Sequence, residues 1–264
     1  MGTRTDPWPD GTPCWVDLAA PDVDAARDFY GAVMGWDFEG SGEEYGHYQV
    51  CRVDGHAAAG IGAIMSPDQP SAWTLYFATS SAERTAQAVT DAGGAVLAPP
   101  FDVPDQGRML VAADPQGAAF GVWEARGHIG AQIVNEPGSL VWEEAAVPDP
   151  DPARDFYTRV FGYRHEPVEG AGEGYTTFHA ADSAGQEGDT TLGGIGGLAG
   201  SPPGTPAHWL CYFAVADADA TARVATEHGG SVPGGVRDSA YGRIATITDP
   251  YGATFAVIGL SEGS

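Results

Sequence analysis

Hydrophobic and polar positions along the first 125 residues predict a strand, a helix and three strands, and then the same order again. Apolar residues alternate over residues 15–19, and a helical stripe follows over residues 22–34, which Gly35 ends. The remaining segments of this pattern are strands at 36–38, 48–53, 58–65 and 73–79, a helix at 82–92, and strands at 95–97, 108–113 and 118–123. The sheet of one such unit has an apolar face that it cannot bury alone, so units must combine in pairs.

The second half of the chain repeats the first. Trp15 and Tyr30 return 127 positions later as Trp142 and Tyr157, whereas Asp-Pro-x-Gly at 114–117 returns 135 positions later at 249–252. About nine residues are therefore inserted, near 183–190. A constant period predicts two homologous domains, which we place at 8–126 and 138–260 with a linker at 127–137.

The repeated motifs resemble those of the vicinal oxygen chelate (VOC) superfamily, which includes glyoxalase I, bleomycin-resistance proteins and extradiol dioxygenases. They are Pro-Asp before the helix, Phe-Tyr within it, Gly-Trp or Gly-Tyr after it, and a late Gly-Arg and Asp-Pro-x-Gly, and together they cover about residues 10–260. The resemblance implies an α+β fold of four βαβββ modules, which form two tandem glyoxalase-like domains with cup-shaped mixed sheets. Gly-Thr-Pro-x-Trp-Val-Asp-Leu at 11–18 and His-Ile-Gly-Ala at 128–131 are similar to two-domain actinobacterial members, some labelled hydroxylases of aromatic polyketide pathways.

The resemblance also locates the positions of the family's metal ligands. One lies on the first strand, seven residues before Asp22 or Asp149, one on the matching strand of the second module, and a carboxylate lies seven residues after the Asp of Asp-Pro-x-Gly. These positions hold Trp15, Trp142, Leu210, Gly121 and Ala256, with Thr74 or Leu75 at the remaining one. Trp, Leu, Gly and Ala side chains do not coordinate divalent metals. We therefore expect no cofactor and disfavour a metal, although a site rebuilt from other residues stays open: His47, His56, His179, His208, Glu143 and Glu144.

Alternation along the first strand brings a carboxylate and an indole to the same face. Val16 and Leu18 should pack on the helix, which leaves Trp15 and Asp17 facing the cup. The repeat predicts the same of Trp142 and Glu144. A carboxyl group beside an indole in a closed cavity has a raised pKa, which suits general acid–base catalysis by Asp17 and Glu144. The alternative is a carboxylate that is structural or that orients a ligand.

Aromatic residues are dense on the predicted cup strands and offer stacking surface for a planar ligand. Ordinary core packing is the alternative for some of them, because a strand has two faces. Arg108 and Arg243 each follow a glycine and are suited to hold a ligand carboxylate or phenolate, or to form a structural salt bridge. The predicted ligand-binding residues are Trp15, Trp73, Arg108, Trp123, Trp142, Tyr175, His208, Tyr212 and Arg243.

Charge narrows the range of partners. Twelve basic residues against 36 acidic ones give a net charge of −24, which repels nucleic acids and anionic membranes. Cys14, Cys51 and Cys211 form no Cys-x-x-Cys pair and are expected to be buried free thiols. No secretory signal or membrane segment is visible, so a cytoplasmic protein is expected, as a monomer or homodimer.

The sequence thus favours a protein that binds a hydrophobic or aromatic metabolite without the family's usual metal, for sequestration, resistance or delivery. One alternative is a metal-independent tailoring enzyme, hydroxylase-like or an isomerase or lyase, of aromatic natural-product metabolism. A second alternative is a metal-dependent glyoxalase or dioxygenase, against which the ligand positions argue.

The missing ligands generate a first prediction. Purified, untagged protein should hold no stoichiometric metal by inductively coupled plasma mass spectrometry, even after loading with Fe, Mn, Ni or Zn. One tightly held ion per chain would contradict the ligand assignment and restore the metalloenzyme alternative.

Overall fold

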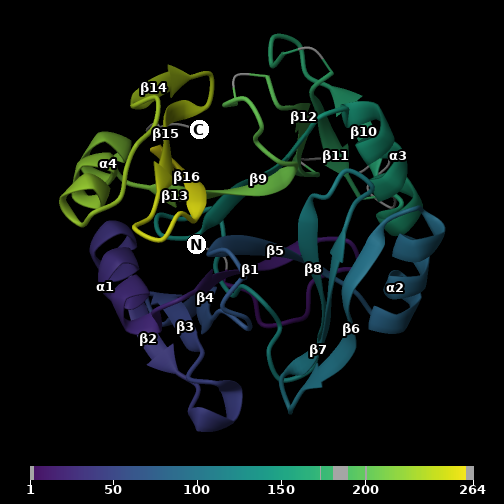
Figure 1. Ribbon diagram of the computed structural model, residues 1–264, viewed down its shortest axis with the longest axis horizontal. Coiled ribbons are helices and arrows are strands. Elements are labelled where there is room, and N and C mark those ends of the chain that lie inside the picture. The colour runs from purple at the N-terminus through teal and green to yellow at the C-terminus, as the bar shows by residue number, and fades with distance from the viewer. Residues whose placement is uncertain (1–2, 173, 181–189, 200, 260–264) are drawn as a thin grey trace.

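The computed structural model describes residues 3–172, 174–180, 190–199 and 201–259, which form two eight-stranded mixed sheets and four α-helices (Figure 1). The first half consists of β1 (Pro13–Ala20), α1 (Val23–Met34), β2 (Asp37–Gly40), a 3₁₀ turn (Glu43–Tyr45), β3 (Gln49–Val53), β4 (His56–Ala63), β5 (Ala72–Ala78), α2 (Ala82–Asp91), β6 (Ala95–Val103), β7 (Gly107–Ala113) and β8 (Ala119–Ala125). The second half consists of β9 (Leu140–Val147), α3 (Pro150–Phe161), β10 (Arg164–Pro167), β11 (Thr176–His179), β12 (Thr191–Gly197), β13 (His208–Val215), α4 (Ala218–Glu227), β14 (Val236–Ser239), β15 (Gly242–Thr248) and β16 (Thr254–Gly259).

Each sheet is built from one half of the chain. The strand orders are β2-β3-β4-β1-β5-β8-β7-β6 and β10-β11-β12-β9-β13-β16-β15-β14. In both sheets the two βαβββ modules meet through an antiparallel pair of first strands, β1 with β5 and β9 with β13. The predicted α+β fold of four modules in two tandem domains is confirmed. The predicted insertion falls largely on residues 181–189, which lie outside the described residues.

Local sequence fixes the helix ends. The Asp22 carboxylate accepts a hydrogen bond from the Ala25 amide at 3.0 Å and so caps the start of α1. Gly35 ends the helix in the left-handed conformation, with φ of 71°. One strand differs from its prediction, because β6 continues through Pro99 and Pro100 to Val103. It is an edge strand paired only with β7, where missing amide donors are tolerated.

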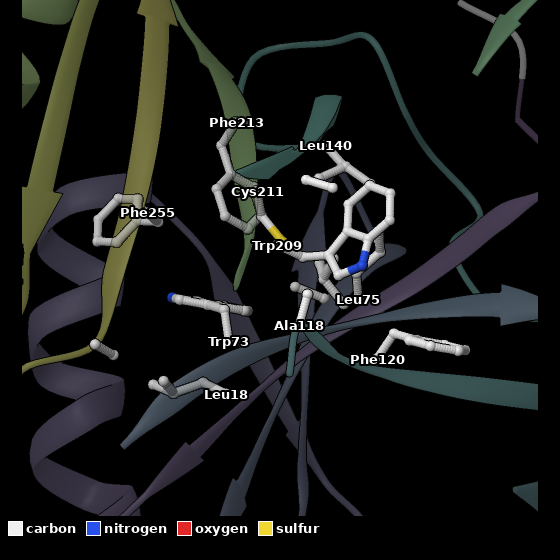
Figure 2. Packing of buried hydrophobic residues seen from close by; sticks show 14 of the residues in the cluster. Leu18, Trp73, Leu75, Ala118, Phe120, Leu140, Trp209, Cys211, Phe213 and Phe255 are labelled. Carbon is white, nitrogen blue, oxygen red and sulfur yellow. The ribbon is translucent and has the colours of Figure 1, made fainter. Parts of the chain in front are cut away.

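The two halves pack against each other through the helix-bearing faces of their sheets. Helix α1 lies beside α4, and α2 lies beside α3 (Figure 1). In the shared core the Trp73 ring lies 5.2 Å from the Phe213 ring, and Phe77 lies 5.3 Å from Trp209, measured between centroids. Figure 2 shows Trp73 between Leu18 of the first half and Phe213 and Phe255 of the second. Apolar side chains from both halves therefore form one continuous core.

A pair of equivalent hydrogen-bond chains crosses this core. The Tyr30 hydroxyl donates to Asp249 at 3.1 Å and accepts from the Trp73 indole at 3.1 Å. In the second half the Tyr157 hydroxyl approaches Asp114 at 3.5 Å and accepts from Trp209 at 2.9 Å. The Phe-Tyr and Asp-Pro-x-Gly motifs therefore join the two halves.

The sequence predicted Trp73 to be a ligand-binding residue, and this prediction is wrong. It shares a strand face with Leu75 and Phe77, which point into the core between the halves. Its indole nitrogen is occupied by Tyr30. Trp73 therefore packs in the aromatic core between the two halves.

Cys14, Cys51 and Cys211 are free and buried, as predicted. Across the described residues, no helix combines the length and the apolar character that a membrane crossing requires.

The chains across the core generate a second prediction. Tyr30→Phe removes one hydroxyl and leaves the Trp73 indole and the Asp249 oxygen without their partner, so the free energy of unfolding should fall by about 1–3 kcal/mol. Urea denaturation measures this. Tyr241→Phe removes a hydroxyl from a residue that is 67% exposed, and should change the free energy by less than about 0.5 kcal/mol. Equal stability of both variants would contradict a structural role for the chain.

Candidate ligand-binding cups

The face of each sheet that points away from the shared core forms a candidate cup. We call the face of the β1–β8 sheet the first cup and that of the β9–β16 sheet the second cup. On β1, Val16 and Leu18 belong to the core, so Trp15 and Asp17 lie on the cup face. On β9, Ala145 and Val147 belong to the core, which leaves Trp142 and Glu144 on the cup face.

In the first cup an indole, a phenol and a carboxyl group are joined by hydrogen bonds. Trp15 Nε1 donates to the Tyr48 hydroxyl at 2.9 Å, and this hydroxyl donates to Asp17 Oδ2 at 3.3 Å. Tyr76 also hydrogen-bonds to Asp17. Burial raises the pKa of the Asp17 carboxyl to about 7, although both tyrosine hydrogen bonds act to lower it. This carboxyl group can therefore hold or release a proton near neutral pH.

The second cup contains the same arrangement. The Tyr175 hydroxyl donates to Glu144 Oε2 at 3.1 Å, and Trp142 hydrogen-bonds to Tyr175. Burial raises the pKa of Glu144, while the Tyr175 hydrogen bond and the charges of His208 and Arg237 act in the opposite direction. Tyr212 completes the set, and burial and the charge of Glu144 both raise the pKa of its phenol.

The carboxylate and the tyrosine of each cup are separated by the same number of residues. The tyrosine lies 31 positions after the carboxylate in both halves. Tyr48 belongs to the aromatic residues of the predicted cup strands but is not among the predicted ligand-binding residues, although this shared spacing would have revealed it. Glycines make room for the rings, since a Cβ on Gly60 would overlap the Tyr48 hydroxyl and one on Gly194 would overlap that of Tyr175.

The donor set of the cups does not fit the family's metal site. Thr74 lies opposite Asp17 and Leu210 lies opposite Glu144, at the position of the second expected ligand. Glu143 points away from Glu144 into the core, where burial raises its pKa well above the usual range. Among the residues that the structure describes, no three His, Cys, Asp or Glu side chains converge as metal ligands would.

The first cup is closed by the segment that connects the halves. The Ala131 and Gln132 amides donate to the carbonyls of Cys14 on β1 and Ala57 on β4, both at 2.7 Å. The His128 ring packs edge-on against Trp15, 4.5 Å between centroids, and burial lowers its pKa to about 4. Trp15 is consequently only 4% exposed. A cavity of about 370 Å³, lined in part by Arg52 and Gln106, lies where this segment meets the rim of the cup.

The second cup is more open. Trp142, Tyr175 and Tyr212 are all partly exposed, whereas Trp15 and Tyr76 of the first cup are buried. A ligand can therefore reach the aromatic and carboxyl groups of the second cup more readily than those of the first.

The structure separates the predicted site residues into three groups. The first cup holds Trp15, Asp17 and Trp123, and the second holds Trp142, Glu144, Tyr175, His208 and Tyr212. Trp73, Arg108 and Arg243 lie on the other side of the sheets. Arg108 is held by Glu83 of α2 at 2.7 Å, and Arg243 by Asp219 of α4 at 2.6 Å. Both arginines share a face with core residues of their strands, so the geometry does not support a ligand contact.

Comparison with known proteins now places the chain in a family. The sequence matches the Glyoxalase/Bleomycin resistance protein/Dioxygenase superfamily over residues 14–122 and 130–257. The chain belongs to this superfamily. The match agrees with the tandem glyoxalase-like folds of the two halves.

Individual relatives cover nearly the whole chain. "Putative glyoxylase CFP32" of Mycobacterium tuberculosis is 40% identical in an alignment 260 positions long, which covers 94% of each chain. The anthracycline biosynthesis protein DnrV of Streptomyces peucetius is 39% identical in an alignment 268 positions long, which covers 96% of this chain and 94% of DnrV. The Mn(II)-bound glyoxalase from Novosphingobium aromaticivorans shares the fold with a TM-score of 0.62 at 16% identity, over 96% of this chain and 83% of that one.

The Asp17 carboxyl generates a third prediction. Its pKa is about 7 in the folded chain, against 3.8 for an ordinary Asp. Between these values the folded chain holds a proton that the unfolded chain has lost, so Asp17 contributes a loss of stability as pH rises through this window. Asp17→Asn removes that dependence. The free energy of unfolding of the Asp17→Asn variant, minus that of the unmodified protein, should therefore rise by about 2–3 kcal/mol between pH 5 and pH 8. Urea denaturation at each pH measures both values.

Asp68→Asn is the matched control, because Asp68 lies exposed in the loop between β4 and β5. Its stability relative to the unmodified protein should not change with pH. A constant difference for Asp17→Asn as well would show that the Asp17 pKa is not raised.

Proposed function

We propose that the protein binds a planar aromatic small molecule in the second cup, without a metal ion. The observation that carries this proposal is the repeated tryptophan–tyrosine–carboxyl arrangement, which is partly exposed in the second cup. Trp142, Tyr175 and Tyr212 offer ring surface for stacking, and Glu144 offers a hydrogen-bonding group between them. Most ligand sites combine apolar walls with a few polar groups in this way.

The chemistry of Glu144 narrows the ligand further. A carboxyl group with a raised pKa donates a hydrogen bond when protonated and accepts one when ionised. It therefore suits the hydroxyl and carbonyl groups of an oxygenated aromatic compound. Relatives named for anthracycline biosynthesis in two Streptomyces support the same class, since anthracyclines are fused aromatic rings with hydroxyl and carbonyl groups. We propose a cytoplasmic role in sequestration, resistance or delivery of such a metabolite.

A second candidate function is metal-independent acid–base catalysis on the same ligand. The raised pKa of Glu144 and the value of about 7 at Asp17 favour it, because a general acid or base works best when its pKa is near the ambient pH. Glu144 is the stronger candidate, since the second cup is the more open one. Glu144→Gln would then abolish turnover while binding remains. Within the part of the chain that the structure describes, the donor set gives no support to a metal-dependent glyoxalase or dioxygenase.

The proposed site generates a fourth prediction. With 1,4-dihydroxyanthraquinone as the probe, isothermal titration calorimetry should find one molecule bound per chain. Trp142→Leu should weaken binding about tenfold, because it removes the stacking surface and the hydrogen bond to Tyr175. Trp15→Leu is the equivalent change in the closed first cup and should alter the affinity by no more than about threefold. In binding free energy this is less than half of the loss expected for Trp142→Leu.

The opposite pattern, with binding lost only in Trp15→Leu, would move the site to the first cup. A stoichiometry of two would show that the connecting segment opens and that both cups bind.

A further inference from the structure

Two basic residues lie on one side of the second cup. His208 lies on β13 on the same strand face as Leu210 and Tyr212. Arg237 lies on β14, opposite Ile244 of β15. Its neighbour Val236 packs against the core, so Arg237 is on the cup face of its strand. Both basic side chains therefore border the Glu144 site.

The Arg237 side chain is also accessible to a ligand. It is exposed, and no carboxylate among the described residues forms an ion pair with it. Arg108 and Arg243, by contrast, are each held by two carboxylates. The charge of Arg237 acts on both Glu144 and Tyr212, which places the guanidinium within electrostatic reach of the polar and aromatic groups of the cup.

Neither of the two basic residues has a basic counterpart at the equivalent position of the first cup, whose rim residue Arg52 is instead paired with Glu39. The position equivalent to Arg237 in the first cup is Phe101, which lies opposite Met109 of β7. The position equivalent to His208 is Ala72. The two cups thus share the tryptophan–tyrosine–carboxyl arrangement and differ in these two residues. A difference confined to the accessible cup indicates a role in what that cup binds.

The acidity of the whole chain makes a local guanidinium group important for binding an anion. With a net charge of −24, the chain repels anions at long range, so an anionic ligand needs a local cation where it binds. A guanidinium group presents parallel N–H donors that match the two oxygens of a carboxylate. We infer that Arg237, assisted by His208, selects aromatic ligands that carry a carboxylate group. This inference rests on the proposed function and adds the ligand class.

The test compares two probes with the same rings. Anthraquinone-2-carboxylate is negatively charged, and its methyl ester is neutral. Arg237→Gln should weaken binding of the carboxylate at least about tenfold, because a hydrogen-bonded ion pair is lost, and should leave binding of the ester within about twofold. Arg237→Lys should lie between, because it keeps the charge without the paired donors. Calorimetry at one fixed pH and ionic strength measures each affinity.

Arg159→Gln is the matched control. Arg159 is exposed on α3, away from both cups, and its replacement changes the net charge by the same amount. It should alter neither affinity. Loss of carboxylate binding in this variant as well would show that overall charge, not Arg237, is responsible, and would overturn the inference.

The remaining outcomes separate the inference from the proposed function. Equal loss of both probes in Arg237→Gln would show that Arg237 supports the shape of the cup, and no loss would show that it does not contact the ligand. Either result overturns the inference while aromatic binding stands. If the unmodified protein binds neither probe, the proposed function fails and the inference fails with it. Trp142→Leu should weaken both probes equally, which ties the effect to the second cup.

Discussion

The contact between the two halves is the constraint on which the rest of the structure depends. Each sheet has an apolar face that its two helices cannot cover alone, and the halves solve this by packing these faces together. Hydrogen bonds join the halves at two equivalent points, Tyr30 to Asp249 and Tyr157 to Asp114. Because these faces are used for assembly, the opposite faces of the sheets remain for ligands. The same geometry explains why Trp73 is structural and Trp15 is not part of the shared core.

The two cups show how a metal-binding fold can present different chemistry. Around the positions that the family resemblance assigns to metal ligands, both halves place an indole, a phenol and a carboxyl group in a hydrogen-bonded series. Gly60 and Gly194 leave the space that the tyrosine rings fill. Burial then raises the pKa of the carboxyl group and so favours its protonated form. The cups are thereby suited to oxygen-bearing aromatic rings.

Duplication has been followed by divergence. The segment that connects the halves supplies Ala131 and Gln132 as hydrogen-bonding partners for β1 and β4, and it sets His128 against Trp15. The first cup thus gains a cover from the chain itself. The second cup keeps its aromatic residues partly exposed and adds His208 and Arg237 at its border. Two copies of one unit therefore differ in their cover, because the first cup is closed by the chain itself and the second is more open.

The sequence by itself determined what depends on neighbouring residues and on repetition. Asp22 and Gly35 set the ends of α1 because capping is local, and the 127-residue offset implied two equal domains. Alternation placed Trp15 with Asp17 on one face. Only the tertiary structure decided which face of each strand meets the other half, and therefore that Trp73, Arg108 and Arg243 lie away from the cups. It alone brought the connecting segment over the first cup and Arg237 to the second, because such contacts between distant segments leave no local pattern.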